Sequence, residues 1–289
     1  MSILSIQSHV SYGHVGNSGS VFILQRMGFD VWPIYTVLYS NHPGYGHFDG
    51  KVVDSKEIKQ IILGIERLSV FNSCKVIIGG YLGSVKTGPE IISACDSVKT
   101  YNPNCLFFCD PVMGDADKGV YVSQQIIDFY KEIGLFAADF IKPNAFELSV
   151  LANHDVYGPH SAAQAARKLI IKYDLKAVLV SSVPILSSSC SRAKENIGSM
   201  IVTASHNWLI QTPLLPIEQR GAGDALMALF VGNFLSNGGD LLAALNLSVS
   251  SIFSIINESL RLEEEELSLI RQQNEILNPS FIFKASVLE

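Results

Sequence analysis

Short apolar runs alternate with longer amphipathic stretches along most of the sequence. The short runs are bounded by polar residues or glycine, as is typical of buried strands, and the longer stretches have the spacing of helices that cover a core. The predicted strands are residues 2–7, 31–37, 75–78, 106–109, 140–141 and 177–180. The predicted helices are residues 21–27, 55–68, 89–98, 124–132, 161–173, 225–235 and 241–256, with another beginning within residues 142–147.

This alternation predicts an α/β fold in which a central, mostly parallel sheet lies between two layers of helices. Residues 197–203 and 207–210 form a later strand pair, which we expect to be antiparallel. Because the sequence lacks fixed-period repeats and linker-like tracts, we expect residues 1–289 to form a single domain. The right-handed connection between parallel strands places the loops that follow them at one edge of the sheet.

Composition narrows the class of protein. The chain has 289 residues, of which 48% are hydrophobic and 17% charged, so it can bury a large core. Its net charge of −6 and the lack of a Lys/Arg block argue against nucleic-acid or membrane-surface binding. The five cysteines lie mostly in apolar segments, which indicates free thiols, and neither a signal peptide nor a run near membrane-span length is found. We therefore expect a cytoplasmic protein.

The strongest chemical signal is the glycine-rich turn that runs straight into the helix predicted over residues 225–235. Gly221 and Gly223 allow a tight turn with outward N–H groups, and the helix dipole adds positive potential, so the turn predicts an anion site. Asp224 at the mouth of that site has the position of a general base for an attacking hydroxyl group. An aspartate after glycine also caps helices, which is the structural alternative.

Acidic, hydroxyl and aromatic residues follow the predicted strands. They are Asp110, Asp115, Glu147, Ser8, Ser181, Ser182, Tyr39, Tyr81 and Tyr121. Ligands of open α/β sheets bind at this edge, and the set suits a hydroxyl acceptor, a nucleoside triphosphate and Mg²⁺. Each member alone has a structural alternative, with Asp110 as a turn residue, Glu147 as a first-turn helix acid and the tyrosines as packing residues.

Two other segments stand out by composition. Residues 39–50 are rich in glycine and aromatic residues, which predicts an active-site flap. Residues 263–266 are consecutive glutamates, and we expect them in the N-terminal turn of a solvated final helix.

The sequence resembles the pyridoxal kinases of the ribokinase-like superfamily over nearly its whole length. The resemblance is carried by residues 5–10 (SIQSHV), 13–17 (GHVGN), 40–42 (SNH), 80–81 (GY), 109–115 (CDPVMGD), 143–147 (PNAFE) and 221–224 (GAGD). The last motif marks only the superfamily, whereas the Ser-His-Val start and the Ser-Asn-His flap are specific to pyridoxal kinases.

The resemblance implies a ribokinase-like, three-layer α/β/α fold and ATP-dependent phosphorylation of the 5′-hydroxymethyl group of pyridoxal, pyridoxine and pyridoxamine. It implies that Asp224 is the base, that Gly221, Ala222 and Gly223 hold the phosphoryl group, and that Asp110 and Glu147 act on Mg²⁺ directly or through water. The implied acceptor-binding positions are Ser8, Tyr39, Pro43 and Tyr81. The implied nucleotide-binding positions are Asp110, Asp115, Tyr121, Lys142, Asn144, Glu147, Ser181 and Ser182. Members of the family are usually homodimers.

Two positions depart from the family pattern. Pro43 replaces a threonine whose hydroxyl faces the acceptor, and Lys142 replaces a threonine before the Pro-Asn pair. The Lys142 ammonium either supplies charge that relatives obtain from a monovalent cation such as K⁺, or pairs with Glu147 and weakens Mg²⁺ binding. The departures leave two alternatives to a pyridoxal kinase: a reservoir protein that binds the vitamer with little turnover, and a related enzyme such as a hydroxymethylpyrimidine kinase.

Overall fold

A ten-stranded sheet forms the middle of the computed structural model, which describes residues 1–185, 196–217 and 219–288. Its strands in chain order are β1 (Ser2–Val10), β2 (Asp30–Tyr39), β3 (Gly50–Val52), β4 (Cys74–Gly79), β5 (Leu106–Cys109), β8 (Phe140–Ile141), β9 (Ala177–Pro184), β10 (Asn196–Val202), β11 (Asn207–Pro213) and β12 (Ser286–Val287). They lie in the order β12-β11-β10-β9-β8-β5-β4-β1-β2-β3. The pairs from β9 through β8, β5, β4 and β1 to β2 are parallel, and the outer pairs are antiparallel.

Helices connect these strands. They are α1 (Asn17–Arg26), α2 (Ser55–Arg67), α3 (Thr87–Tyr101), α4 (Gln124–Phe129), α5 (Leu135–Ala137), α6 (Ala145–Ala152), α7 (Pro159–Tyr173), α8 (Ala222–Ser236) and α9 (Leu241–Arg261). Shorter helical segments are η1 (Pro43–Tyr45), η2 (Phe71–Ser73) and η3 (Tyr130–Gly134), and a small separate hairpin joins β6 (Gly114–Asp115) to β7 (Gly119–Val120).

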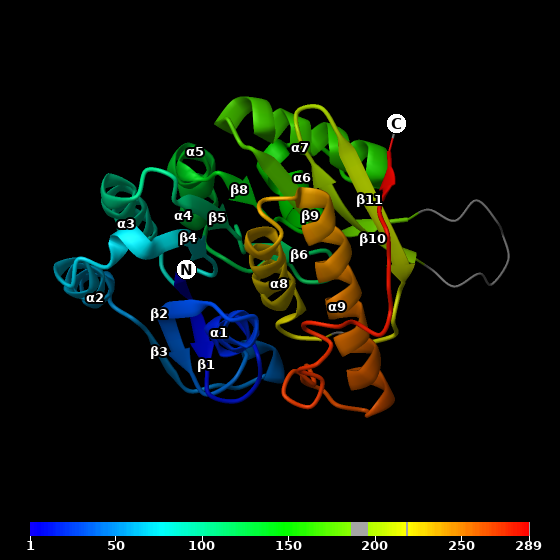
Figure 1. The fold of residues 1–289 in the computed structure, drawn as a ribbon, viewed down its shortest axis with the longest axis horizontal. Helices are drawn as coiled ribbons and strands as arrows, with labels where there is room; N and C mark the ends of the chain where they lie inside the picture. The colour runs from blue at the N-terminus through cyan, green and yellow to red at the C-terminus, as the bar shows by residue number, and fades with distance from the viewer. Residues whose placement is uncertain (186–195, 218, 289) are drawn as a thin grey trace, which may run out of the picture.

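Alternate residues of the central strands face opposite helical layers, as the pleat of a strand requires. On β1, Ile3 packs in the core shared with α1, α8 and α9, whereas Leu4 packs in the core shared with α2, α3, α6 and α7. Figure 1 shows α8 and α9 crossing the near face of the sheet. The predicted mostly parallel sheet between two helical layers is therefore confirmed.

Most predicted elements are present, and the differences lie at their ends. The strand predicted over residues 106–109 and the antiparallel pairing of the two later strands are confirmed. The first helix begins at Asn17, earlier than hydropathy predicts, because this buried amide donates to the backbone oxygens of Ser5 and Ile34. A polar residue that satisfies buried strand carbonyls gives no apolar signal.

The prediction of a final helix at residues 263–266 is wrong. The last α-helix ends at Arg261, Glu263 has a left-handed φ of 54°, and residues 262–288 contain no α-helix. These residues instead fold back as a tail along α9 and finish in β12, which pairs with β11 (Figure 1). Three hydrogen bonds join the last part of the tail to the helix: Phe281 N to Ser254 Oγ (3.1 Å), Phe283 N to Ser250 Oγ (2.9 Å) and Ala285 N to Asn246 Oδ1 (2.8 Å).

Among the described residues, α9 is the one helix with the length and hydropathy of a membrane span, with a mean hydropathy of 1.4. The length and hydropathy of α9 thus differ from the expectation that no run in the sequence approaches membrane-span length. In the fold, 56% of that apolar window is buried inside the protein. Its apolar side chains pack with those of α8, which is the environment of a core helix.

The cysteines within the described ranges are free and buried, as expected of thiols in apolar segments. They are Cys74, Cys95, Cys105 and Cys109. Cys190 lies outside the described residues.

Candidate active site

The glycine turn brings Asp224 against the N-terminal loop. Gly221 is the N-cap residue of α8 with a φ of 81°, and a side chain there would also collide with the carbonyl oxygen of His14. Asp224 lies in the first turn of α8, and its Oδ2 accepts a hydrogen bond of 2.8 Å from Gly16 N. The helix-cap alternative is therefore wrong, because this carboxylate binds a loop more than 200 residues away and makes no cap of its own helix.

Burial raises the pKa of Asp224, although the Gly16 N–H and the nearby Lys142 ammonium oppose the shift. A carboxylate with a raised pKa is a stronger proton acceptor than an ordinary aspartate. The turn therefore places a buried carboxylate of raised pKa in the first turn of α8, as the predicted roles of anion site and base require.

Asp110 and Lys142 form a buried ion pair at the ends of β5 and β8. Lys142 Nζ lies 2.9 Å from Asp110 Oδ2, with Asp110 2% and Lys142 4% exposed. Burial raises the pKa of Asp110 to about 7, against the opposing effect of Lys142. Burial lowers the pKa of Lys142, but the Asp110 and Glu147 carboxylates outweigh it and raise that pKa overall. The lysine is therefore a fixed cation.

This cation lies close to the glycine turn. A β-carbon built on Gly223 would stand 3.5 Å from Lys142 Nζ. The ion-pair partner of Lys142 is Asp110, and not Glu147 as one of the sequence-based alternatives supposed. The pair places one positive charge beside the predicted phosphate site.

Glu147 holds two loops together. Its Oε1 accepts hydrogen bonds from Met113 N (2.9 Å) and Gly114 N (3.5 Å), and its Oε2 accepts one from Asn144 N (2.9 Å). Asn144 completes a capping box at the start of α6, and its Nδ2 donates to Gly114 O at 2.8 Å. Both oxygens of Glu147 are thus engaged by backbone N–H groups, which leaves Glu147 poorly placed as a direct metal ligand.

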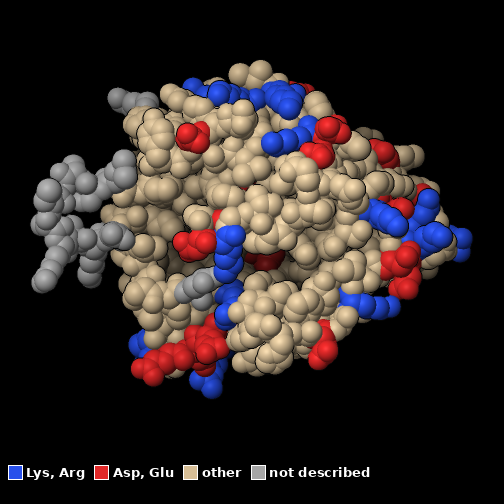
Figure 2. All heavy atoms as spheres, turned by 180° about the vertical axis from the view of Figure 1, so that it is seen from behind, with Lys and Arg blue, Asp and Glu red and all other residues tan. Residues whose placement is uncertain are grey.

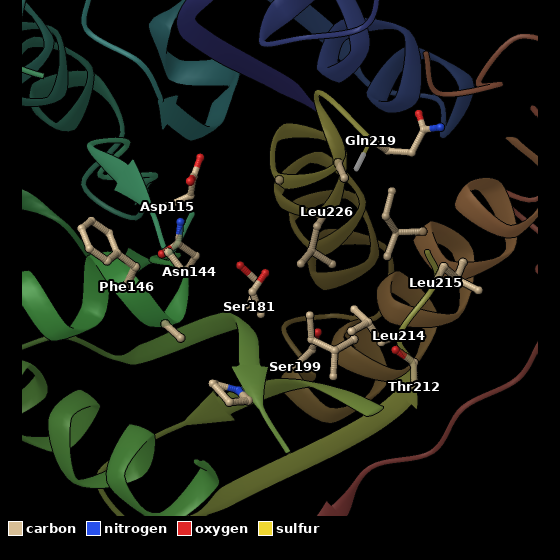
Figure 3. Close-up of a pocket in the computed structure, with 18 of the residues that line it drawn as sticks. Asp115, Asn144, Phe146, Ser181, Ser199, Thr212, Leu214, Leu215, Gln219 and Leu226 are labelled. Carbon is tan, nitrogen blue, oxygen red and sulfur yellow. The ribbon is translucent and has the colours of Figure 1, made fainter. Parts of the chain in front are cut away.

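A cavity of about 720 Å³ opens beside the glycine turn. Several predicted nucleotide-binding residues line it, as do two residues of the turn: Asp115, Asn144, Ser181, Ser182, Ala222 and Gly223. Figure 3 shows Asp115 and Asn144 on one side of the cavity and Leu214, Leu215 and Gln219 on the other. From behind the molecule, Figure 2 shows a hollow near the middle with acidic atoms on its floor. Asp110, Lys142 and Glu147 are buried behind this lining, and Tyr121 lies outside it, 50% exposed.

The predicted acceptor-binding residues lie on the β1–β2–β4 side of the turn. Ser8 is buried, and a side chain at Gly16 would collide with its hydroxyl, so Ser8, Gly16 and Asp224 form a continuous series. The pKa of Tyr81 is raised by burial and by the nearby Tyr39.

The flap predicted over residues 39–50 is the connection between β2 and β3. Pro43 begins the short helix η1 on this connection and is exposed. The Tyr39 ring packs against Phe48 with ring centroids 4.6 Å apart. The predicted acceptor-side residues and the flap therefore stand on the side of Asp224 that carries β1 and β2.

Sequence reasoning missed the far wall of the cavity. It is formed by the end of β11, the residues that follow this strand and one face of α9, and it includes Thr212, Leu214, Ile217, Gln219, Val249, Ile252 and Phe253. Gln219 donates to Glu264 O at 2.9 Å, while its Oε1 is buried without a hydrogen-bond partner and thus has acceptor capacity. The position of residues 212–219, just before the glycine turn, was a usable signal; the α9 residues look like ordinary core.

Metal-binding capacity is limited on the protein side. Within residues 1–185, 196–217 and 219–288, no group of three or more His, Cys, Asp or Glu side chains is arranged to hold a metal ion. Asp110 Oδ1 is buried and has no hydrogen-bond partner. This oxygen fits a hard cation or a cation-bound water, so a metal here would take its remaining ligands from water or a bound substrate.

Comparison with known proteins agrees with this geometry. The sequence pattern of the phosphomethylpyrimidine kinase family matches residues 73–269. The chain is 41% identical to pyridoxal kinase PdxY of Rubrobacter xylanophilus, over 98% of this chain and 96% of that protein. It is 38% identical to pyridoxal kinase PdxY of Deinococcus radiodurans, over 99% and 96% of the two chains.

The fold matches solved structures over its whole length. Pyridoxal kinase from Leishmania donovani in complex with ADP and pyridoxamine has a TM-score of 0.90 at 24% identity, over 100% of this chain and 99% of that one. The same enzyme with ADP and pyridoxine gives 0.90 at 25% identity and the same coverage. Fold and site thus define a small-molecule kinase of the ribokinase-like class. Within that class, the chain belongs to the pyridoxal kinase family.

Proposed function

We propose that this protein transfers the γ-phosphoryl group of ATP to the 5′-hydroxymethyl group of pyridoxal, and also of pyridoxine and pyridoxamine. The observation that carries the proposal is the Asp224 carboxylate, held by Gly16 N at 2.8 Å between the Ser8 side of the site and the glycine turn. Support comes from full-length relatives named pyridoxal kinase and from similarly folded kinases that hold ADP with pyridoxamine or pyridoxine.

In this proposal Asp224 accepts the hydroxyl proton while the oxygen attacks phosphorus. Backbone N–H groups of Gly221, Ala222 and Gly223, at the positive end of α8, hold the transferring phosphoryl group. The buried Lys142 ammonium adds a fixed positive charge beside them. The chain supplies positioning and electrostatics, which are the main contributions of proteins to phosphoryl transfer.

The cavity lined by Asp115, Asn144, Ser181 and Ser182 is proposed to hold the nucleotide, with the apolar face of α9 against the base. The acceptor ring is proposed to lie between Ser8, Tyr39, Pro43 and Tyr81. Tyr121, outside the cavity lining, is proposed to approach the phosphates.

Mg²⁺ would be held by the nucleotide phosphates and by Asp110 through its unpartnered Oδ1, with Glu147 acting by fixing the Met113–Gly114 backbone. When bound, Mg²⁺ neutralises charge on the phosphates. We propose that Lys142 takes the place of a monovalent cation such as K⁺.

The remaining expectations belong to the same proposal. Residues 1–289 would form a single domain, and the protein would act as a cytoplasmic homodimer that binds neither nucleic acid nor membranes. The match over nearly the whole length of both relatives supports the single domain, and the net charge of −6 supports the lack of nucleic-acid and membrane binding. The homodimer rests on the resemblance to the family.

One assay tests the function and both alternatives. Purified protein receives Mg²⁺-ATP with pyridoxal, pyridoxine, pyridoxamine or hydroxymethylpyrimidine, and ADP and phosphorylated product are followed over many turnovers. Repeated turnover with the three vitamers supports the proposal. Product that stops near one equivalent identifies a reservoir protein, and preference for hydroxymethylpyrimidine identifies the alternative of a hydroxymethylpyrimidine kinase.

A further inference from the structure

Three segments far apart in sequence meet at the flap. The Tyr45 hydroxyl donates a hydrogen bond of 2.6 Å to Glu266 Oε1, in the loop after α9. The guanidinium of Arg220 stacks over the Tyr45 ring, 4.1 Å from its centroid, and Arg220 Nη2 donates to Gly44 O at 3.3 Å. We call Tyr45, Arg220 and Glu266 the flap latch.

Within the flap, Tyr45 is partly buried and its hydroxyl has a hydrogen-bond acceptor. From residue 43 to residue 50, Tyr45 is the one residue of intermediate burial, and the others are exposed. Burial and the Glu266 carboxylate raise the pKa of Tyr45 to about 12, so its hydroxyl stays protonated and can donate near neutral pH. Hydrogen bonds from a hydroxyl to a carboxylate are among the stronger ones in proteins.

Each partner of Tyr45 is tied to the phosphate side of the site. Arg220 directly precedes Gly221, the N-cap residue of α8. Glu266 pairs in a short bridge with Arg220, and its Oε2 accepts a hydrogen bond of 3.1 Å from His14 N. The carbonyl of His14 is the group that Gly221 would strike if it carried a side chain. The flap is therefore anchored to the segments that shape the anion site.

We propose that Tyr45 and Glu266 are positioning residues that hold the flap closed over the acceptor during phosphoryl transfer and keep water out. The inference rests on the proposed kinase function. With the latch broken, a water oxygen attacks the γ-phosphorus while Asp224 takes its proton. The bond to the bridging oxygen then breaks, and ADP and inorganic phosphate leave without a phosphorylated vitamer.

The test compares Tyr45→Phe, which keeps the ring under Arg220 but removes the hydroxyl, with Glu266→Gln, which keeps an acceptor oxygen. Tyr12→Phe is the matched control, because Tyr12 packs edge-on against Tyr45 at 6.0 Å and its hydroxyl makes no hydrogen bond within the described residues. We expect Tyr45→Phe to raise the pyridoxal KM about ten-fold with kcat little changed. ADP released per phosphorylated vitamer should exceed one.

Glu266→Gln should fall between the parent and Tyr45→Phe, and Tyr12→Phe should match the parent. A Tyr45→Phe variant with the parent's KM and equal amounts of ADP and phosphorylated vitamer overturns the latch. Amide hydrogen exchange of residues 43–50 in ligand-free protein gives a second readout. We expect exchange to be about ten-fold faster than in the parent for Tyr45→Phe and unchanged for Tyr12→Phe. Exchange in Tyr45→Phe at the rate of the parent also overturns the latch. If the parent protein shows no turnover with any vitamer, the proposed function is overturned, and the exchange experiment alone then decides whether the latch exists.

Discussion

Asp224 connects the N-terminal loop to the helix that carries the anion site. Because its carboxylate is fixed by Gly16 N, Asp224→Asn keeps the shape of the site but removes the ability to accept a proton. We expect turnover to fall by roughly 10²- to 10⁴-fold with little loss of ATP affinity. Steady-state kinetics and nucleotide binding measure the two effects, and turnover within a few-fold of the parent would remove Asp224 from the role of base.

The same residue sets a pH dependence. Burial raises the pKa of Asp224 above the ordinary value of 3.8, and only the deprotonated carboxylate accepts a proton. Turnover should therefore be lost as pH falls through this raised pKa, with the acid limb of the kcat profile above pH 3.8. Melting curves over the same pH range separate this titration from acid unfolding.

Lys142 keeps a positive charge buried beside Asp110. Replacing Lys142 removes the partner of a buried carboxylate, which costs about 3–5 kcal/mol unless another cation or a proton compensates. Lys142→Thr should make both turnover and melting temperature depend on K⁺, because threonine offers an oxygen ligand. Lys142→Met, which offers none, should lose activity without rescue by K⁺. If the dependence of turnover on K⁺ and on Mg²⁺ is the same in Lys142→Thr as in the parent, Lys142 has no role in cation use.

At the scale of elements, the tail and α9 fit each other by geometry. Four helical residues advance about 6 Å and two extended residues about 6.6 Å, so Asn246, Ser250 and Ser254 meet every second tail amide. Ser254→Ala leaves the Phe281 N–H without its acceptor and should lower the free energy of unfolding by about 1–3 kcal/mol. Chemical denaturation measures the loss. Asn257→Ala is the control on the same helix, because its side chain makes no hydrogen bond within the described residues.

This tail also explains how the α9 wall of the cavity is held. Phe253 lines the cavity and packs edge-on against Phe281 and Phe283 of the tail, with ring centroids 5.2 Å and 4.9 Å away. One face of α9 thus serves the cavity and the neighbouring face binds the tail. A destabilised tail should therefore weaken nucleotide binding as well as stability.

For the whole molecule, the two cores share every central strand, which predicts cooperative unfolding of residues 1–289 as one domain. The two tryptophans report them separately, since Trp32 packs against one core and Trp208 against the other. Trp32→Phe and Trp208→Phe variants each keep one tryptophan as a probe. For each variant we expect urea unfolding followed by fluorescence to coincide with urea unfolding followed by far-UV circular dichroism. A fluorescence transition displaced from that of the same variant's secondary structure would indicate two independently folding units.

The sequence by itself determined the order of elements and the chemistry at the strand ends. Apolar periodicity and turn residues are local signals, so the strand over residues 106–109, the antiparallel later strands and the glycine turn before α8 were all predictable. The motifs predicted a kinase of this family, and the comparisons confirm the family. The assignment of individual site residues stays a prediction until the variants are measured.

Only the tertiary structure decided which side chains meet. The pairing of Lys142 with Asp110, the engagement of Glu147 by backbone N–H groups and the contact of Tyr45 with Glu266 all join residues from different elements. Their partners depend on strand order and on how the loops cross, which local sequence patterns do not encode. The glutamate run was misread for the same reason, because a charge run is typical of solvated helices while Glu266 binds the flap through contacts that only folding creates.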